Sequence, residues 1–550
     1  MPNIKKLAGT ADSDLEITAP KSPINIQQLT AELRNHPDKN FTTYLINGFV
    51  LGFDTGFDVP KLPYECKNLL SAIRQPDITS QLIQSELDKG YLIGPFDKNP
   101  YLHYRISPIG IAEGKYSAKQ RLIVDMSAPH DNAIHPSLNE LIDKEEFSLK
   151  YVTIDHAIKR IKQLGKGSNM SKLDVRDAFK QVPLQKRLWP FHGIKWNNRV
   201  YFYTRLVFGS RSSPKIFDCL SRAICWILQN NYDIKHVLHL LDDFLAVSSP
   251  EENARQTMDV MLAVFDRLGV PLSPSKTIGP VTVIEYLGII LDSINMEARL
   301  PTQKLERIAN ILQTFSTKKS CTKRELLSLL GHLHFACRVI YPGRAFVSYL
   351  ITLSASVKKM HHYVAITAAC RSDMAMWLKF LRQWNGISMF MNDELTMAED
   401  IQFFTDATPK AYAGYYCGKW FQGEFPSDFV SADSVASMAL YELFPIVMAA
   451  VLWGDHWVQR RIVVNCDNAA TVDIINKGRS KVLIIQKFVR RLIWCAAKGQ
   501  FMIIAKHIPG KSNVIADALS RYNMLQFRRV APGADRVPVP CLPVSELQMN

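Results

Sequence analysis

The sequence lacks the features of a secreted or membrane-anchored protein. Its first residues, MPNIKKLAGT, contain no apolar core like that of a signal peptide. No apolar run approaches the roughly 18–20 residues that a membrane span needs. The longest run, Ile446 to Trp453, is predicted to be the core of a helix. We therefore expect an intracellular protein, cytoplasmic or nuclear, that is not secreted and has no membrane partner.

The cysteines are few and are scattered along the sequence. The chain has 10 cysteines in 550 residues, and none of them forms a C-x-x-C pair. Disulfide frameworks and structural zinc sites both depend on closely spaced cysteines. The pattern predicts buried thiols in a reducing compartment.

Acidic residues are outnumbered by basic ones. The 66 Lys and Arg against 51 Asp and Glu give a formal net charge of +15. An excess of this sign favours a polyanionic partner, because each phosphate neutralised by Lys or Arg releases a counterion. On composition alone, a basic but unspecialised surface is the alternative. The 47% of hydrophobic residues supply material for more than one core.

The periodicity of apolar residues changes along the chain and predicts several domains. Strands alternate with helices from residue 91, an almost wholly helical stretch follows, and a β-rich pattern starts again near Asp400. We expect five segments: an N-terminal extension, partly disordered and then helical (1–90), a first mixed region (91–295), a helical region (296–395), a second mixed region (396–525) and a proline-containing linker-like tail (526–550).

Two segments of the first mixed region carry acidic residues at the ends of apolar strands. One segment contains Asp174, and the other contains the adjacent pair Asp242 and Asp243. Half-buried carboxylates are costly unless they are paired or bind a metal, and adjacent carboxylates repel each other. Two Mg²⁺ ions held by such a group can activate a 3′ hydroxyl and stabilise a leaving pyrophosphate. For an isolated Asp-Asp pair, the alternative is a solvated turn.

The order of short motifs in this region resembles that of reverse transcriptases. The resemblance rests on six segments, each weak alone, that follow one another in family order between residues 107 and 288: a fingers-like segment (Ser107–Asp125), motif A (Leu173–Phe179), motif B (Phe208–Pro214), motif C (Leu241–Asp243), motif D (Leu268–Lys276) and motif E (Glu285–Gly288).

This resemblance implies roles for charged residues. Asp174 and Asp242 would be metal ligands, with Asp243 as the third carboxylate. Arg121, with Lys115 or Lys119, would hold the incoming triphosphate, because cations placed on developing phosphate charge favour phosphoryl transfer. A solvated loop is the alternative for the two lysines.

The resemblance also implies roles for uncharged residues of the nucleotide site. Phe179 would be a steric gate facing the sugar 2′ position, with a core aromatic as the alternative. Gly209 would let backbone approach the nucleotide or template. Phe208 and Lys276 would complete the substrate-binding set. Leu240 departs from the family, which usually has an aromatic residue there, and this bears on the contact with the primer end.

A second group of acidic residues follows residue 400. Asp406, Glu442, Asp467 and Asp517 resemble the carboxylate centre of ribonuclease H, and the segment from His507 to Arg521 resembles the "HIPGKxNxxADALSR" end of retroelement ribonucleases H. Four carboxylates can hold two hard cations and direct a water at a phosphodiester. His507 would move protons or assist product release. Taken singly, these residues read as helix caps, rim charges and a surface histidine.

The helix expected between Lys481 and Ala497 has one basic face. Lys487, Arg490 and Arg491 share that face by helical spacing, and the opposite face is apolar. An amphipathic helix with a solvated face is the simpler interpretation. A backbone clamp for an RNA–DNA hybrid is the alternative.

Other strings resemble one group of retroelements. The stretch around Asp54-Thr55-Gly56, the segment Cys466–Ser480 and the ending from Val537 are similar to DIRS-type elements, in which a tyrosine recombinase usually follows. Gypsy-like elements are the next-best subgroup. Asp54-Thr55-Gly56 also matches the aspartic protease triplet, but too few residues follow it to complete a protease lobe.

The resemblance therefore implies an α+β multidomain protein, a right-hand polymerase of fingers, palm and thumb followed by a ribonuclease H-like α/β domain with a mixed five-stranded sheet. It implies an RNA-directed and DNA-directed DNA polymerase with ribonuclease H activity, using two Mg²⁺ or Mn²⁺ ions per active site. Its partners would be an RNA template, a DNA primer, dNTPs and the RNA–DNA hybrid, with the oligomeric state left open. A domesticated, non-catalytic nucleic-acid-binding descendant and a structural subunit of a larger assembly are the alternatives.

Overall fold

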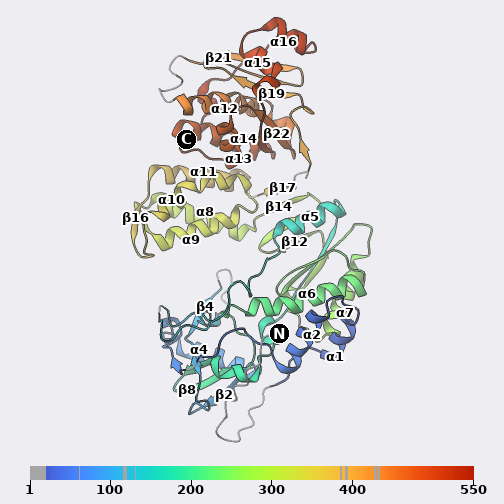
Figure 1. The fold of residues 1–550 in the computed structure, drawn as a ribbon, viewed down its shortest axis with the longest axis vertical. Coiled ribbons are helices and arrows are strands. Elements are labelled where there is room, and N and C mark those ends of the chain that lie inside the picture. The colour runs from blue at the N-terminus through green and yellow to red at the C-terminus, as the bar shows by residue number, and fades with distance from the viewer. Residues whose placement is uncertain are drawn as a thin grey trace. The chain divides into compact units, whose positions relative to one another are not determined.

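The computed structural model describes residues 20–60, 62–114, 120–130, 132–384, 387–390, 394–426, 429 and 434–549. The chain divides into two compact units, Met1–Thr282 and Val283–Asn550 (Figure 1). Both units combine helices and strands, which confirms the predicted α+β fold. The disorder expected at the start of the chain lies outside the described residues.

The rest of the N-terminal extension, expected to be helical, contains short helices and also the strand β1 (Tyr64–Glu65) in its described part. It contains α1 (Ile26–Glu32), α2 (Lys39–Leu51), α3 (Leu70–Ile73) and α4 (Pro76–Asp88). The side chains of Asn25 and Asp38 cap α1 and α2 by accepting hydrogen bonds from backbone N–H groups of their first turns. Leu29 and Leu45 are buried in the main core of the first unit, so α1 and α2 are part of that core.

A four-stranded antiparallel sheet forms the centre of the first unit. Its order is β11 (Ile278–Val281), β6 (Asn169–Asp174), β10 (Asp243–Ser248) and β9 (Val237–Leu240). The helices α6 (Ser213–Asn231) and α7 (Ala254–Arg267) contribute their apolar faces to the same core, where the rings of Phe244 and Phe265 pack 5.0 Å apart. The packing of these two helices with the sheet holds in place the end of the sheet at which β6 finishes and β10 begins.

A second sheet and a hairpin complete the first unit. The sheet has the order β1 (Tyr64–Glu65), β3 (Arg105–Ile106), β7 (Gly193–Trp196), β8 (Arg199–Tyr203) and β2 (Leu92–Phe96). The hairpin pairs β4 (Ile109–Glu113) with β5 (Gln120–Val124).

The second unit starts with strands, earlier than the expected boundary at 295/296. β12 (Val283–Tyr286), β13 (Ile289–Asp292), β14 (Glu297–Arg299) and β17 (Ile387–Met389) form one antiparallel sheet. The expected helical region follows as α8 (Thr302–Thr317), α9 (Lys323–Ala336), α10 (Ser348–Ala355) and α11 (Ala368–Trp384), with the 3₁₀ helix η4 (Tyr341–Phe346). The strands β15 (Ser320–Thr322) and β16 (Tyr363–Ala365) pair beside these helices.

In the described part of the predicted nuclease-like region, six strands form two hydrogen-bonded groups. β19 (Phe403–Ala407), β20 (Ala411–Tyr416) and β21 (Lys419–Glu424) are antiparallel, and β18 (Leu395–Thr396), β22 (Arg461–Cys466) and β23 (Met502–His507) are parallel. β19 and β22 are in contact, so the two groups lie where one five-stranded sheet was expected. The helices of this region are α12 (Ser434–Trp453), α13 (Ala469–Lys477), α14 (Leu483–Lys498) and α15 (Val514–Ser520).

Helix α12 contains the longest apolar run of the sequence. Among the described residues, the helical stretch Met438–Trp457 alone is long and apolar enough to cross a membrane, and 72% of its most apolar window is buried in the protein. Leu443 and Val447 are fully buried in the core that α12 shares with β19 and α14. The interpretation of this run as a core helix is therefore confirmed.

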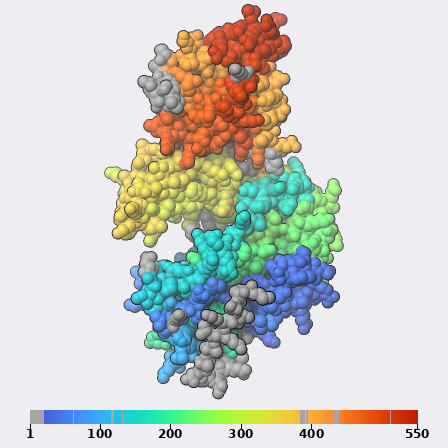
Figure 2. Space-filling view, in the orientation of Figure 1, coloured from blue at the N-terminus to red at the C-terminus, as the bar shows by residue number. Residues whose placement is uncertain are grey.

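The tail is packed, so the interpretation of residues 526–550 as a linker is wrong. Its elements are α16 (Met524–Val530) and the 3₁₀ helix η7 (Val544–Leu547). Phe527 and Leu547 are fully buried, and the Trp420 indole N–H donates to the Asp535 carbonyl at 2.7 Å. The Val539 N–H donates to the Trp420 carbonyl, so the proline-containing stretch lies along the edge strand β21. In the space-filling view, the red C-terminal end of the chain packs against the orange residues that precede it in the same unit (Figure 2). The apolar side chains of the tail complete a core and cover a strand edge, which a free linker would not do.

Candidate active sites

The first candidate site lies where β6 ends and β10 begins. Asp174 is the last residue of β6 and is buried; Asp243 is the first residue of β10 and faces Asp174 directly across the antiparallel pair. Directly opposite residues have Cβ atoms about 4.5–5.5 Å apart on the same face of a sheet. The Val175 N–H donates to the Asp242 carbonyl at 2.9 Å. The structure thus brings together the three carboxylates expected from the sequence.

The turn that carries Asp242 has an unusual backbone. Leu241 has φ +53°, in the left-handed region that few non-glycine residues adopt. The Ser221 hydroxyl on α6 donates to the Leu241 carbonyl at 2.8 Å and holds this turn. Sequence reasoning missed Ser221, because nothing in a helical serine signals a partner that is distant along the chain.

Burial and repulsion between neighbouring charges raise the pKa values of Asp242 and Asp243. Burial is the largest cause of the raised pKa of Asp243, about 6, and the charges of Asp242 and Asp174 add to it. Burial also raises the pKa of Asp242; the Asp174 charge adds to this increase, whereas Lys276 and Arg121 oppose it. Carboxylates that hold protons because they crowd each other can exchange those protons for a divalent cation.

Two cations expected to bind substrate are described near this group. Lys276, in the 3₁₀ helix η3 (Pro274–Lys276), has its Nζ 2.9 and 3.1 Å from the two oxygens of Asp174. Arg121 lies on β5 with an exposed side chain. Lys115 and Lys119 lie outside the described residues.

Phe179 and Phe208 form an aromatic pair beside this sheet. Phe179, in the 3₁₀ helix η1 (Ala178–Gln181), is buried, with its ring centroid 4.7 Å from that of Phe208 and 5.7 Å from that of Phe217. Phe208 is exposed. This placement is compatible both with a gate and with core packing.

A glycine with positive φ and an asparagine side chain together set the conformation of the loop of motif B. Gly209 has φ +105°, and a Cβ atom there would lie 2.4 Å from the Val124 carbonyl oxygen, so this position requires glycine. The Asn139 amide donates to the Gly209 carbonyl at 2.8 Å and accepts from the Arg211 N–H at 2.8 Å. Asn139 was not predicted, because it lies in an irregular segment without a recognisable pattern.

The second candidate site gathers four acidic residues from separate elements. Asp406 lies in β19, Glu442 in α12, Asp467 directly after β22 and Asp517 in α15. Burial raises the pKa of Glu442 to about 9, and the charges of Asp406 and Asp467 add to this. Burial likewise raises the pKa of Asp406 to about 6, to which Asp467 and Asp517 contribute. These charge interactions show that the four predicted carboxylates lie close together.

Ligand atoms of this group are close enough to share an ion. Those of Glu442, Cys466 and Asp467 lie within 4.8 Å of one another. Mg²⁺ and Mn²⁺ prefer carboxylate oxygens, whereas a thiolate suits softer metals. Burial and the Glu442 charge raise the pKa of the Cys466 thiol. The carboxylates therefore fit a hard cation, and the protonated thiol is a neighbour rather than a ligand.

The segment after His507 is fitted closely around the acidic group. The exposed His507 has its Nε2 3.1 Å from the Asp467 carbonyl oxygen. A Cβ atom at Gly510 would lie 2.7 Å from Asp467 Oδ2, which accounts for glycine there. The Asn513 amide donates to the Thr405 carbonyl at 2.7 Å, and the Ser520 hydroxyl donates to Asp406. The string noted in the sequence thus supplies supporting hydrogen bonds as well as Asp517.

Arg490 is not on a solvated face, so that interpretation of the helix is wrong for this residue. Its side chain is 4% exposed and forms an ion pair with the fully buried Asp373 of α11. Lys487 and Arg491 remain partly exposed on the same helix.

All 10 cysteines are free, and six of them are buried: Cys219, Cys225, Cys321, Cys337, Cys370 and Cys466. This agrees with the expectation of unpaired thiols.

Comparisons with known proteins match the first site. Residues 97–291 match the family model described as reverse transcriptase (RNA-dependent DNA polymerase). The chain is 24% identical over 410 residues to polyprotein P3 of Commelina yellow mottle virus, covering 71% of this chain and 20% of that protein. It is 22% identical over 370 residues to the retrovirus-related Pol polyprotein from transposon opus of Drosophila melanogaster, covering 65% of this chain and 35% of that protein. The chain thus spans between a fifth and about a third of these relatives.

Among solved structures, the foamy viral protease–reverse transcriptase in complex with an RNA/DNA hybrid is similar with a TM-score of 0.46 at 15% identity, covering 90% of this chain and 65% of that one. The site geometry and the family match concern the same residues, since Asp174, Asp242 and Asp243 all lie within the matched range. Residues 97–291 therefore match the reverse transcriptase family model, and the chain is similar to a viral polyprotein and to a retrovirus-related polyprotein of a transposon.

Proposed function

We propose that this protein is an RNA-directed and DNA-directed DNA polymerase that also cleaves the RNA of an RNA–DNA hybrid. The observation that carries the proposal is the pairing of Asp174 with Asp243 across β6 and β10, inside the range that matches reverse transcriptases. A second group of carboxylates in the other unit, in which burial raises the pKa values of Asp406 and Glu442, supports a separate nuclease site.

At the polymerase site, Asp174, Asp242 and Asp243 would hold two Mg²⁺ or Mn²⁺ ions. Bound there, the ions would activate the primer 3′ hydroxyl and stabilise the leaving pyrophosphate. Arg121, with Lys115 or Lys119, would hold the triphosphate, and Lys276 would move from Asp174 to substrate. Phe179 would face the sugar, and the loop that contains Gly209 would contact the nucleotide or template.

At the nuclease site, Asp406, Glu442, Asp467 and Asp517 would hold a second pair of ions, which would direct a water at the phosphodiester. Glu442 must give up the proton that burial favours before it can bind a cation. His507 lies beside Asp467 on the exposed rim, where it would transfer a proton or assist product release.

The expected partners are an RNA template, a DNA primer, dNTPs and the RNA–DNA hybrid. The net charge of +15 supports polyanionic partners. We propose that the chain comes from a DIRS-type element, with a gypsy-like element as the next candidate, and that it works inside the cell.

Primer extension on poly(rA)/oligo(dT) and cleavage of a labelled hybrid, each with Mg²⁺ or Mn²⁺, test both activities. Asp242→Asn is expected to abolish DNA synthesis and spare hybrid cleavage; Asp467→Asn is expected to do the reverse. The two sites use separate carboxylates on separate units, so their effects should be nearly additive. Loss of both activities in either folded variant would contradict the two-site proposal. No activity in the wild-type protein would favour the non-catalytic descendant or the structural subunit.

A further inference from the structure

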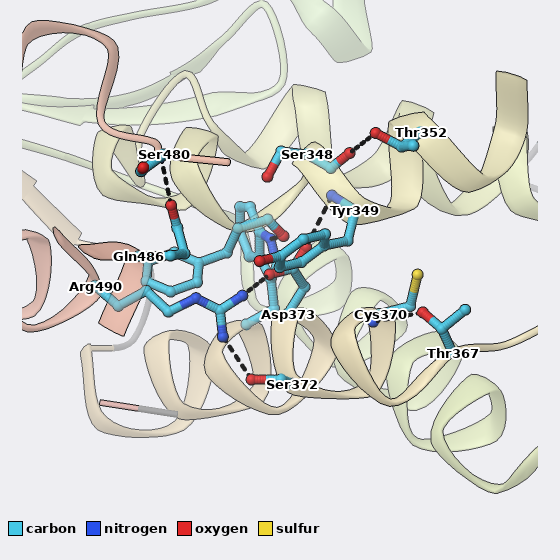
Figure 3. Close-up of polar contacts among 12 residues, drawn as sticks. Ser348, Tyr349, Thr352, Thr367, Cys370, Ser372, Asp373, Ser480, Gln486 and Arg490 are labelled. Atoms are coloured by element: carbon cyan, nitrogen blue, oxygen red, sulfur yellow. Dashed lines mark hydrogen bonds and ion pairs between the residues drawn. The ribbon is translucent and has the colours of Figure 1, made fainter. Parts of the chain in front are cut away.

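A fully buried ion pair joins the nuclease-like region to the helices that precede it. Arg490 of α14 donates through one guanidinium nitrogen to Asp373 and through the other to the Ser372 hydroxyl, both on α11 (Figure 3). The two charged side chains are 4% and 0% exposed. The pair lies within the second unit and involves none of the seven proposed metal ligands.

Other elements of the helical region surround this pair. The Arg490 guanidinium lies over the rings of Phe346 in η4 and Tyr349 in α10, 5.2 and 5.5 Å from their centroids. The Tyr349 N–H donates to the second Asp373 oxygen at 3.3 Å (Figure 3). One arginine side chain of α14 therefore contacts three elements of the region between residues 341 and 384.

A second contact along α14 supports the same attachment. The ring of Trp494 packs 5.7 Å from that of Phe380, and the Lys379 ammonium lies 4.1 Å from the Trp494 centroid. Arg490 and Trp494 are one helical turn apart, so a single face of α14 makes both contacts.

The opposite face of α14 packs on the helix that carries Glu442. Phe488 is fully buried and lies 5.7 Å from Phe444 of α12, two residues after Glu442. Helix α14 thus lies between the helical region and α12, and any shift of α14 on α11 would reach the acidic group through rigid packing.

The Arg490–Asp373 pair is better suited to fixing the arrangement of α14 on α11 than to stabilising the folded protein. A buried ion pair often stabilises a protein no better than apolar side chains of similar size. A planar guanidinium that serves a carboxylate and a hydroxyl together can do so only in one relative arrangement. Burial raises the pKa of Asp373 to about 7 even beside Arg490, so a displaced pair would leave a costly buried group.

We propose that Arg490 is a positioning residue: its buried contacts with Asp373 and Ser372 hold α14, and with it the acidic group of the nuclease-like region, in one position against the helices 302–384, and so set where a bound hybrid is cut. The inference rests on the proposed nuclease activity, because the cut position is read from hybrid cleavage. It adds a residue distant from the carboxylates that controls the position of cleavage rather than its chemistry.

The test uses the full chain and a hybrid with a recessed DNA 3′ end. Wild-type protein is expected to cut at one main position. The double variant Arg490→Met/Asp373→Leu replaces both charges by apolar groups and is expected to lose that main position, giving cuts spread over neighbouring nucleotides while primer extension and total cleavage persist. Lys498→Met removes one charge from an exposed position of the same helix and is the matched control, with cuts unchanged.

A folded double variant that cuts at the wild-type position would overturn the proposal. If that variant does not fold, native-state hydrogen exchange of the wild-type chain decides: α11 and α14 must open together with the same free energy, and earlier opening of α11 alone would overturn the proposal. A wild-type protein that cuts no hybrid would refute the proposed nuclease function instead, and the exchange experiment would still test the rigid attachment.

Discussion

Replacing Glu442 by glutamine should stabilise the metal-free protein while abolishing hybrid cleavage. Burial in α12, with the charges of Asp406 and Asp467, raises the pKa of Glu442 from 4.5 to about 9. Between these two values the folded state binds a proton that the unfolded state releases, so this residue lowers stability progressively as pH rises from 4.5 to 9. Glutamine has the same shape and no proton to lose.

The size of the effect follows from the pKa difference. At pH 8 the carboxyl of Glu442 is ionised in the unfolded state and mostly protonated in the folded state. This pH lies 3.5 units above the unfolded pKa of 4.5, and each unit corresponds to about 1.4 kcal/mol. Coupling to Asp406 shares part of this among the carboxylates, so we expect a gain of about 3–5 kcal/mol for Glu442→Gln at pH 8 and little gain at pH 5.

Denaturant unfolding in EDTA at pH 5 and pH 8 measures this gain. Glu546→Gln, at an exposed position of η7 in the same unit, is the matched control and should leave the unfolding midpoint unchanged. Added Mg²⁺ should stabilise the wild-type protein more than the variant, because only an ionised Glu442 binds the ion. A variant that is equally or less stable than wild type at pH 8 without metal would refute this account of the acidic group.

Four further predictions concern other parts of the molecule. Phe179→Val should lower discrimination between dNTP and rNTP about 10–100-fold, roughly 1.4–2.8 kcal/mol, as measured by incorporation efficiencies; unchanged discrimination in a folded, active enzyme would assign Phe179 to the core. Gly209→Ala should cost about 1–3 kcal/mol and reduce primer extension, because its Cβ would collide with the Val124 carbonyl; a fully active variant of wild-type stability would contradict the strain. Because burial and two neighbouring carboxylates raise the pKa of Asp243 to about 6, the Mg²⁺ needed for half-maximal extension should rise about tenfold per pH unit below 6; a flat dependence would argue against Asp243 as a ligand. Leu547→Ala should lower stability by roughly 2–5 kcal/mol, since the side chain is fully buried, whereas a free tail would tolerate it.

The local features of this protein could be derived from its sequence. Acidic residues at the ends of apolar strands predicted the positions of Asp174, Asp243 and Asp406, because strand periodicity and the cost of burying charge both depend on neighbouring residues. The same reasoning predicted the helices between 301 and 395 and the buried run in α12.

Arrangements that depend on distant partners could not be derived in this way. Helical spacing assigns Arg490 to the basic face of α14, but it does not say that Asp373 of another helix covers that face. The prolines of the tail suggested a linker, whereas Phe527 and Leu547 find their places in a core that only the folded unit provides.

The sequence by itself determined which residues could do chemistry, and the tertiary structure decided how they meet. The register of β6 against β10 sets Asp174 opposite Asp243, and the packing of α12 on β19 brings Glu442 close to Asp406. Raised pKa values, strained turns and buried ion pairs all arise from desolvation and from charges distant along the chain. Local sequence does not contain those quantities, because they depend on which surfaces the folded chain places in contact.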